Sequence, residues 1–549
     1  MMPYADANVR NGVVVVRDGG LGKPGPGFDW KGGLLTRHML IASAAALCFI
    51  SLLATALLVP LVMRFARAIG AVDRGGYRKV FQGAMPLLGG LGVALPLIAL
   101  CMAGAVAGYG VVRHWQWFWL YRRDVFDALF SLAGERGNFL TLAWGGAAIV
   151  ALGLVDDIKG MRARWKLAGQ TVVAIMVCLS GQMLTTVSLP FWGSVTLGAG
   201  VGGLISVLWI VGLINAFNLI DGVDGLASGV ALVGAGALIA LSMIQQDVFV
   251  MFAAAALAGS LLAFLFYNFP PARIFLGDTG SMFLGYALAL LSLSGAQKSE
   301  AAIVVAGPML ALSLPLFETV VSVLRRSIRG VPLFAGDAHH THHRLLSKGY
   351  SQPRIVLTFC GVALLLAGAA IMSALIPPGS RWAWCPYALY AGALLYIAVL
   401  AGYLRPASFE ATLERHQRNK GFQALARYVA PRLGRARPPV ETGLLLELCR
   451  QELELAGIEV RRQANRLVLL ATQPGNDDAA RTPFETFGVK SSDGQDLLVA
   501  YAFVSAPDET RRQDVCACLA AIFDGMDIDE LDAVISRDGN RRNSIPGQP

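Results

Sequence analysis

Asn215-Ala-Phe-Asn218-Leu-Ile-Asp221-Gly-Val-Asp224-Gly225 is a polar stretch that separates two long apolar segments. Its two Asn and two Asp recur at every third position, so on a helix they would form one skewed polar stripe. Polar side chains at the end of a membrane helix are costly unless they face protein, water or a ligand. A capped helix end followed by a turn is the simpler alternative, because Asn, Asp and Gly are common in both. Charged clusters elsewhere in the chain favour a functional site.

The composition is that of a membrane protein. The chain has 549 residues, of which 55% are hydrophobic and 15% charged, and its mean hydropathy is +0.55. A soluble protein of this size carries more charge. The net charge of +9 is typical of the Lys and Arg excess in the cytoplasmic loops of membrane proteins, so we expect no nucleic-acid partner. The eight Cys lack metal-type spacing and predict no disulfide framework.

Apolar runs of membrane-spanning length recur from about residue 39 to residue 404. We expect an all-α polytopic membrane protein with about eleven transmembrane helices and a small C-terminal α/β cytoplasmic domain. No cleavable signal peptide is visible, and the first apolar run is long enough for a signal anchor. The expected spans are residues 38–62, 87–108, 138–155, 166–186, 199–214, 227–244, 248–267, 281–296, 301–324, 355–377 and 386–404.

The polar loops between these spans differ in charge. One set of alternate loops holds 16 Lys and Arg, whereas the opposite set holds 6. The positive-inside rule therefore places the first set in the cytoplasm. The C-terminal tail, after an odd number of spans, is then cytoplasmic, and the N-terminal tail lies outside. The first set comprises residues 64–79, 156–166, 215–226, 267–280 and 325–354.

Composition shifts divide the chain into five parts. We expect a polar N-terminal tail (1–37), a transmembrane domain (38–404), a basic juxtamembrane linker (405–439), a small accessory domain (440–535) and a disordered tail (536–549). The linker is either a segment that contacts lipid headgroups or a solvated charged helix. In the accessory domain, the pattern predicts helices at 441–456 and 509–523 and strands at 466–471 and 496–504.

Two of the inner loops add carboxylates to the polar stretch. Asp156 and Asp157 end one expected span, and adjacent carboxylates repel each other unless a cation or a proton neutralises them. Lys159 supplies part of that charge, and a divalent metal could supply the rest. Asp278, preceded by Gly277, stands immediately before another span. For both loops an ordinary helix cap is the alternative.

Two further inner loops supply cations and imidazoles. The first contains Lys79, which could hold a lipid phosphate or belong to an ordinary positive-inside loop. The last inner loop reads His339-His340-Thr-His342-His343-Arg344, so four of the seven His lie within five residues. No Cys lies nearby for zinc, whereas imidazole N–H groups and a guanidinium suit a diphosphate. Carboxylates and Asn that could bind Mg²⁺, next to cations for phosphates, indicate a phosphoryl-transfer site.

These motifs, taken together, resemble the polyprenyl-phosphate N-acetylhexosamine-1-phosphate transferases (glycosyltransferase family 4), which include the phospho-MurNAc-pentapeptide translocase. The resemblance covers roughly residues 40–404. The matching motifs are Val-Asp156-Asp157-Ile-Lys, Asn215-x-x-Asn218-x-x-Asp221-Gly-x-Asp224-Gly, Leu-Gly-Asp278 and the His loop, in the family's order and spacing. The His loop looks like that of the undecaprenyl-phosphate GlcNAc-1-phosphate transferase branch. The segment after residue 404 departs from the family pattern.

The resemblance implies an enzyme at the cytoplasmic face of the bacterial inner membrane. It would transfer an N-acetylhexosamine 1-phosphate, GlcNAc 1-phosphate first, from a UDP-sugar to undecaprenyl phosphate, releasing UMP and starting a cell-envelope glycan such as O-antigen. The implied cofactor is Mg²⁺, with Mn²⁺ as the alternative. The resemblance leaves open whether the protein forms a homodimer.

The resemblance also implies roles for individual residues. Asp156 and Asp157 would be catalytic, with Asp156 orienting or deprotonating the lipid phosphate. Asn218 and Asp278 would bind the metal. The remaining residues would bind substrate. Lys79 and Lys159 are candidates for the lipid phosphate, Asp221 and Asp224 would shape the nucleotide pocket, and His342, His343 and Arg344 would hold the diphosphate. Asn215, His339 and His340 would also contribute to substrate binding.

Three other functions are weighed against this one. The phospho-MurNAc-pentapeptide transferase branch usually has a Met-Ala-Pro stretch before its His motif, which is absent here. A CDP-alcohol phosphatidyltransferase would share the Asp221 to Gly225 spacing, but the Ala-Arg that its motif requires is missing. An ion-coupled transporter would place its carboxylates near the bilayer midplane, whereas these lie at loop edges.

Overall fold

The computed structural model describes residues 7–10, 13–16, 34–73, 85–118, 134–189, 193–297, 306–329, 340–376, 380–403, 409–433, 439–462, 467–472, 485–490, 496–503 and 509–523. It divides the chain into two compact units. The first comprises residues 1–73, 84–320 and 339–404, and the second comprises residues 74–83, 321–338 and 405–549.

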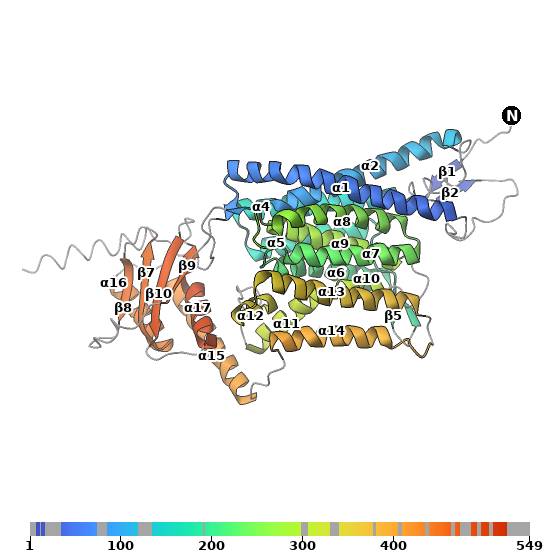
Figure 1. Cartoon of the computed structure of the whole chain (residues 1–549). Helices are drawn as coiled ribbons and strands as arrows, with labels where there is room; N and C mark the ends of the chain where they lie inside the picture. Colours follow the sequence, from blue (N-terminus) through green and yellow to red (C-terminus); the bar gives the residue numbers. More distant parts are fainter. Residues whose placement is uncertain are drawn as a thin grey trace, which may run out of the picture. The chain divides into compact units, whose positions relative to one another are not determined.

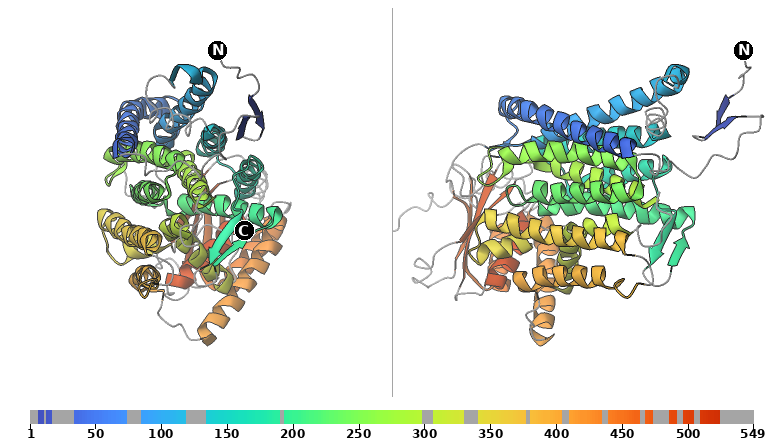
Figure 2. Two further views of the ribbon diagram at one scale, coloured as in Figure 1. Left: turned by 90° about the vertical axis from the view of Figure 1, so that its right-hand side faces the viewer. Right: turned by 45° about the vertical axis from the view of Figure 1, so that its right-hand side comes forward.

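Long helices running side by side make up most of the first unit (Figures 1 and 2). They are α1 (Leu34–Ala68), α2 (Gly89–Phe118), α4 (Arg136–Lys159), α5 (Ala163–Leu179), α6 (Ala199–Ile220), α7 (Leu226–Gln245), α8 (Val248–Asn268), α9 (Gly277–Gln297), α10 (Ala306–Ala311), the part of α11 (Ser313–Arg329) up to residue 320, α12 (Thr341–Ser347), α13 (Gln352–Leu375) and α14 (Cys385–Ala401).

Three short antiparallel hairpins lie between or before these helices. The first falls in the segment for which the sequence predicted only a polar tail. The hairpins pair β1 (Ala7–Arg10) with β2 (Val13–Val16), β3 (Val72–Asp73) with β4 (Met85–Pro86), and β5 (Thr186–Leu189) with β6 (Gly193–Thr196).

Among the described residues, eight helices are long and apolar enough to cross a membrane, namely α1, α2, α4, α6, α7, α8, α9 and α13. The predicted polytopic helical class is therefore confirmed. The other three expected spans are also helical, but α5 and α14 have only 17 residues each. The third is divided into α10 and α11. Pro315 explains the break, because its ring clashes with the carbonyl of residue 311, where α10 ends.

The most deeply enclosed span is α9. Its apolar window is 100% buried, against 22% for α1. Its neighbours hold it by polar contacts as well as packing: Tyr286 donates a hydrogen bond to the Thr141 carbonyl oxygen on α4 at 2.7 Å, and Ser292 accepts one from the Trp209 indole on α6 at 2.9 Å. Because α9 is fixed on all sides, it holds the side chains of its first residues rigidly in position.

The described part of the second unit's C-terminal segment is a four-stranded antiparallel sheet with three helices (Figure 1). The strand order is β8-β7-β10-β9. The predicted helix at 509–523 matches α17 (Glu509–Phe523), and the predicted strands match β8 (Leu467–Thr472) and β10 (Asp496–Phe503). The predicted helix at 441–456 is α16 (Pro439–Glu452). The prediction missed β7 (Leu455–Arg462) and β9 (Glu485–Lys490).

The basic segment before this sheet contains α15 (Phe409–Leu433), which belongs to the same core. Phe422, Ala426 and Val429 recur at helical spacing and are buried with residues of α16 and α17. Lys420 and Arg427 lie on the exposed side. The apolar stripe of α15 is therefore part of the same core as α16 and α17, although charged residues dominate its sequence.

Close contact between α1 and α8 depends on Gly259, and this generates a testable prediction. A Cβ at Gly259 would lie 1.9 Å from the Cys48 carbonyl oxygen on α1. We expect Gly259→Ala to separate the two helices and to cost about 1–3 kcal/mol of stability, as overpacking does. The measurement is the midpoint of thermal unfolding of the purified protein in detergent.

Gly236→Ala is the matched control, because a Cβ there meets no atom within 4 Å. It should leave the midpoint unchanged. Equal midpoints for the two variants would contradict the packing account.

Candidate active site

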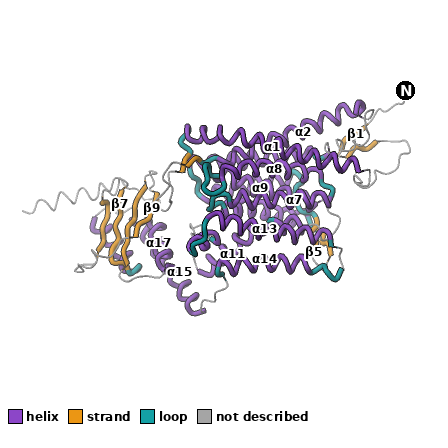
Figure 3. Tube along the Cα trace, viewed as in Figure 1, coloured by secondary structure: helices purple, strands orange, loops and turns teal. Residues whose placement is uncertain are grey.

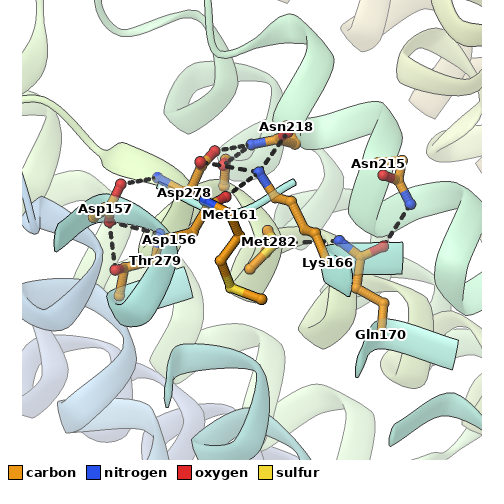
Figure 4. Close-up of polar contacts among 11 residues, drawn as sticks. Asp156, Asp157, Met161, Lys166, Gln170, Asn215, Asn218, Asp278, Thr279 and Met282 are labelled. Carbon is orange, nitrogen blue, oxygen red and sulfur yellow. Dashed lines mark hydrogen bonds and ion pairs between the residues drawn. The ribbon is translucent and has the colours of Figure 1, made fainter. Parts of the chain in front are cut away.

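Loops join the helices of the first unit at their ends (Figure 3), and contacts between four of these helix ends form the candidate site. Asp156 and Asp157 lie in the last turn of α4, Lys166 lies in the first turn of α5, Asn218 lies near the end of α6, and Asp278 is the second residue of α9. Their side chains point toward one another in Figure 4. Residues up to 122 positions apart in the chain are thus brought into one cluster.

The Lys166 ammonium stands at the centre of this cluster (Figure 4). Its Nζ lies 2.6 Å from Asp156 Oδ2 and 2.9 Å from Asp278 Oδ2. It also donates to Asn218 Oδ1 at 3.4 Å. The Asn218 amide donates in turn to Asp278 Oδ1 and, at 3.0 Å, to Ser281 Oγ. Three oxygen-bearing side chains from three helices therefore surround one positive charge.

Lys166 is the functional candidate that the sequence interpretation missed. Lys159 was expected to neutralise the two acids, but it is exposed, and the lysine paired with Asp156 is Lys166. The Lys166 side chain is only 14% exposed. The sequence held no signal that singles out Lys166, because Arg164 stands two residues earlier on the same helix.

Asp157 caps the start of α9. Its Oδ1 accepts the Asp278 N–H at 2.8 Å, and its Oδ2 accepts the Thr279 N–H at 3.0 Å together with the Thr279 hydroxyl. The first N–H groups of a helix lack partners within it, and a carboxylate there also complements the helix dipole. Asp157 thereby holds Asp278 in place. Its predicted catalytic role is not tested by these contacts and stays a prediction.

Gly277 makes this cap feasible. Its φ is +73°, a conformation that residues with a Cβ rarely adopt. A Cβ there would also lie 2.8 Å from Asp157 Oδ2. The glycine before Asp278 is therefore required by the close approach of α4 to α9.

The other polar residues of the 215–225 stretch contact different partners. The Asn215 amide donates to Gln170 Oε1 at 2.7 Å and to the Val211 carbonyl oxygen at 2.8 Å. Asp224 is buried and accepts the Ala272 N–H at 3.2 Å. Of the four polar side chains in the stretch, Asn218 is thus the one in direct contact with the Lys166 cluster, whereas Asn215 and Asp224 hold neighbouring segments.

Asp221 follows α6 and lies within the electrostatic range of the cluster. Burial raises the pKa of Asp221 well above its ordinary value, and the negative charges of Asp278, Asp157 and Asp224 raise it further. An ionised Asp221 is therefore unfavourable in these surroundings unless a nearby cation offsets its charge.

The donor set suits a hard cation such as Mg²⁺. Asp156, Asp278 and Asn218 offer carboxylate and amide oxygens, the ligands that Mg²⁺ prefers. These oxygens already converge on an ammonium, which stands in for a cation. Within the described ranges, no group of three or more His, Cys, Asp and Glu has the geometry to hold a metal. Protein ligands would accordingly be few, and water and substrate oxygens would complete the coordination.

The His-rich segment reaches the same region through α12. His342 is 1% exposed, and neither of its ring nitrogens has a hydrogen-bond partner in the described part of the chain. A Cβ at Gly222 would lie 2.4 Å from His342 Nε2, so the imidazole packs directly on the residue after Asp221. Burial lowers the pKa of His342 well below its ordinary value, with smaller contributions from the charges of His343 and His340. The imidazole is therefore neutral at pH 7.

The remaining predicted substrate-binding residues are placed as follows. The rings of His340 and His343 lie 5.7 Å and 4.4 Å from that of His342. Arg344 instead contacts the end of α14, where it donates to the Gly402 carbonyl oxygen at 3.3 Å and stacks on the Tyr403 ring. Lys79 and His339 lie outside the described residues.

Comparison with known proteins agrees with this geometry. The family model for glycosyl transferase family 4 matches residues 139–296, a range that contains the whole Lys166 cluster. A protein of Bacillus subtilis described as a probable undecaprenyl-phosphate N-acetylglucosaminyl 1-phosphate transferase is 34% identical over 323 residues, which is 59% of this chain and 83% of the relative.

Two further relatives differ in their stated activities. A decaprenyl-phosphate N-acetylglucosaminephosphotransferase of Mycobacterium leprae is 34% identical over 41% of this chain and 62% of its own length. A phospho-N-acetylmuramoyl-pentapeptide-transferase of Desulforudis audaxviator is 28% identical over 60% of this chain and 96% of its own length. With the site motifs in place and most of the Bacillus relative covered, the chain belongs to glycosyl transferase family 4.

Proposed function

We propose that this membrane protein transfers N-acetylglucosamine 1-phosphate, or the 1-phosphate of a related N-acetylhexosamine, from a UDP-sugar to undecaprenyl phosphate. The products are undecaprenyl-diphospho-sugar and UMP. The observation behind the proposal is the cluster in which Asp156, Asp278 and Asn218 surround the Lys166 ammonium at 2.6–3.4 Å. The activities stated for the Bacillus and Mycobacterium relatives support it.

The N-acetylglucosamine substrate is favoured over phospho-MurNAc-pentapeptide. The Bacillus relative named for N-acetylglucosamine is 34% identical over 323 residues, whereas two pentapeptide transferases are 28% identical over 348 residues and 34% identical over 241 residues. A transporter is disfavoured, because the polar side chains of the cluster lie at the ends of α4 and α6 and at the starts of α5 and α9 rather than midway along the helices.

The reaction exchanges one phosphorus–oxygen bond for another. An oxygen of the lipid phosphate attacks the sugar-bearing phosphorus of the UDP-sugar, and the bond from that phosphorus to the UMP oxygen breaks. The lipid phosphate is already anionic at neutral pH, so position and charge compensation matter more than proton removal. Bound Mg²⁺, held by Asp278, Asn218 and Asp156, would neutralise part of the diphosphate charge.

The chain's own side chains divide the remaining work. Lys166 donates charged hydrogen bonds to phosphate oxygens, and Asp156 holds its ammonium in place. Asp157 fixes the first turn of α9 so that Asp278 keeps its orientation. A neutral His342 carries one N–H that is buried and has no hydrogen-bond partner in the described part of the chain, so it is a candidate donor to the diphosphate.

The proposal includes the location of the reaction. The loops that meet at the site belong to the set of alternate loops that holds most of the Lys and Arg. The positive-inside rule therefore favours the cytoplasmic face of the bacterial inner membrane. The nucleotide donor would reach the site from the cytoplasm and the lipid acceptor from the bilayer. The product would then start a cell-envelope glycan such as O-antigen.

The central test is Mg²⁺-dependent release of UMP by the purified protein with UDP-GlcNAc and undecaprenyl phosphate. We expect turnover with Mg²⁺, none after EDTA, and recovery when Mg²⁺ is restored. Asp278→Asn should reduce UMP release below detection, because it removes a carboxylate from the cation site while preserving side-chain size.

Asp247→Asn is the matched control. Asp247 is a buried acid that caps α8 by accepting the Val250 N–H at 3.1 Å, and Asn can serve the same cap. This variant should turn over normally. Full activity of Asp278→Asn, or turnover in EDTA, would remove the metal assignment.

A second prediction concerns Lys166. Lys166→Met should lower kcat by roughly 10²–10³-fold, the effect of losing one charge-stabilising group in an enclosed site. The comparison variant is Arg164→Met, which removes an exposed cation from the same helix turn. If both variants retain wild-type kcat, the ammonium has no role in the reaction.

A third prediction concerns the C-terminal domain. A chain ending at residue 404 should insert and release UMP within about threefold of the full-length rate, because all described members of the site precede that residue. A chain ending at residue 439 should instead aggregate more, because α15 would expose Phe422 and Val429. A correctly inserted but inactive 1–404 chain would show that the domain takes part in turnover.

A further inference from the structure

The short helix α12 is held at its first residue by two distant segments. Thr341 is fully buried, and its N–H donates to Glu318 Oε2 on α11 at 3.3 Å. Its hydroxyl shares a hydrogen bond of 2.7 Å with the hydroxyl of Tyr403, two residues beyond α14. Glu318 is itself 1% exposed. One threonine therefore joins α12 to both α11 and the end of α14.

The later turn of α12 is attached to the same end of α14. Arg344 donates to the Gly402 carbonyl oxygen at 3.3 Å, and its guanidinium lies 4.6 Å from the centre of the Tyr403 ring. Lys348 donates to the Leu400 carbonyl oxygen at 2.6 Å. The last carbonyls of a helix lack partners within it, so these two cations cap α14 while they anchor α12.

This anchoring matters because α12 is too short to be stable on its own. It has only seven residues, whereas isolated helices shorter than about 12 residues are marginal in water. His342 follows Thr341 directly and packs against Gly222. Its two unpartnered, buried nitrogens are costly to maintain, so neighbouring contacts must fix the ring there.

We propose that Glu318 and Tyr403 are positioning residues for the transfer reaction. Acting through Thr341, they hold α12 so that the His342 imidazole stays against the turn at Gly222 and meets the diphosphate of the nucleotide donor. The inference rests on the proposed function for the identity of that diphosphate. Neither Glu318 nor Tyr403 contacts substrate.

The test uses the full-length protein and substitutions that remove single contacts. Tyr403→Phe removes the hydroxyl and keeps the ring under Arg344, and Thr341→Val removes the other hydroxyl. Each should raise the KM for UDP-GlcNAc about tenfold, the scale of one lost hydrogen bond, while the KM for undecaprenyl phosphate stays unchanged. Glu318→Gln, which keeps an acceptor for the Thr341 N–H, should retain most of the donor affinity that Glu318→Leu loses.

Tyr396→Phe is the matched control, because Tyr396 is an exposed tyrosine on α14. It should behave as wild type. Combining Tyr403→Phe with His342→Ala separates positioning from a general structural role, since the tyrosine variant should add nothing once the imidazole is gone. An additive loss, or an equal rise in both KM values, would overturn the inference.

A labelling measurement distinguishes this inference from the proposed function, because it needs no turnover. Diethyl pyrocarbonate should modify His342 slowly in the wild type and several-fold faster in Tyr403→Phe and Thr341→Val, as read by mass spectrometry. Unchanged labelling would overturn the positioning role even in an inactive protein. Wild-type protein that releases no UMP, but shows the labelling difference, would instead disprove the proposed reaction.

Discussion

The two salt bridges of Lys166, to Asp156 and to Asp278, hold the site together. Two carboxylates brought close in a partly enclosed place repel each other, and the ammonium between them offsets that repulsion. Removing one member would leave its partners charged and uncompensated. The ends of α4, α5 and α9 are thus tied by charge as well as by packing. A substrate phosphate or a metal entering the cluster would change this balance directly.

The rigidity of the surrounding helices gives the cluster its geometry. Asp278 begins the most deeply buried span, and the carboxylate of Asp157 caps the same helix from α4. The enclosed position of α9 keeps Asp278 in place. Gly277 permits the close approach of Asp157 to the start of α9 that the cap needs. Precise placement of charged groups is worth most where water is partly excluded. Stability and chemistry are therefore served by the same contacts.

The acid cluster and the His helix are supported differently. The carboxylates stand on long, buried helices, whereas His342 stands on a seven-residue helix that depends on α11 and α14 for its position. Glycine again permits a close contact, because a side chain at position 222 would collide with the His342 imidazole. The acid cluster is thus held rigidly, whereas His342 is held through the contacts of α12 with its neighbours. Such a site can admit a bulky nucleotide donor and still hold its diphosphate.

The order and spacing of the polar motifs, read without coordinates, were enough to predict the helical membrane class, because periodicity and the cost of polar groups in lipid are local properties. They also singled out Asp156, Asn218 and Asp278, which the structure brings together. They could not show that Lys166 rather than Lys159 neutralises Asp156, that Arg344 turns toward α14, or that α15 joins the C-terminal core. Each of those outcomes depends on which helices become neighbours. Contacts between residues far apart in the chain arise from packing of the whole bundle, and no local pattern encodes them.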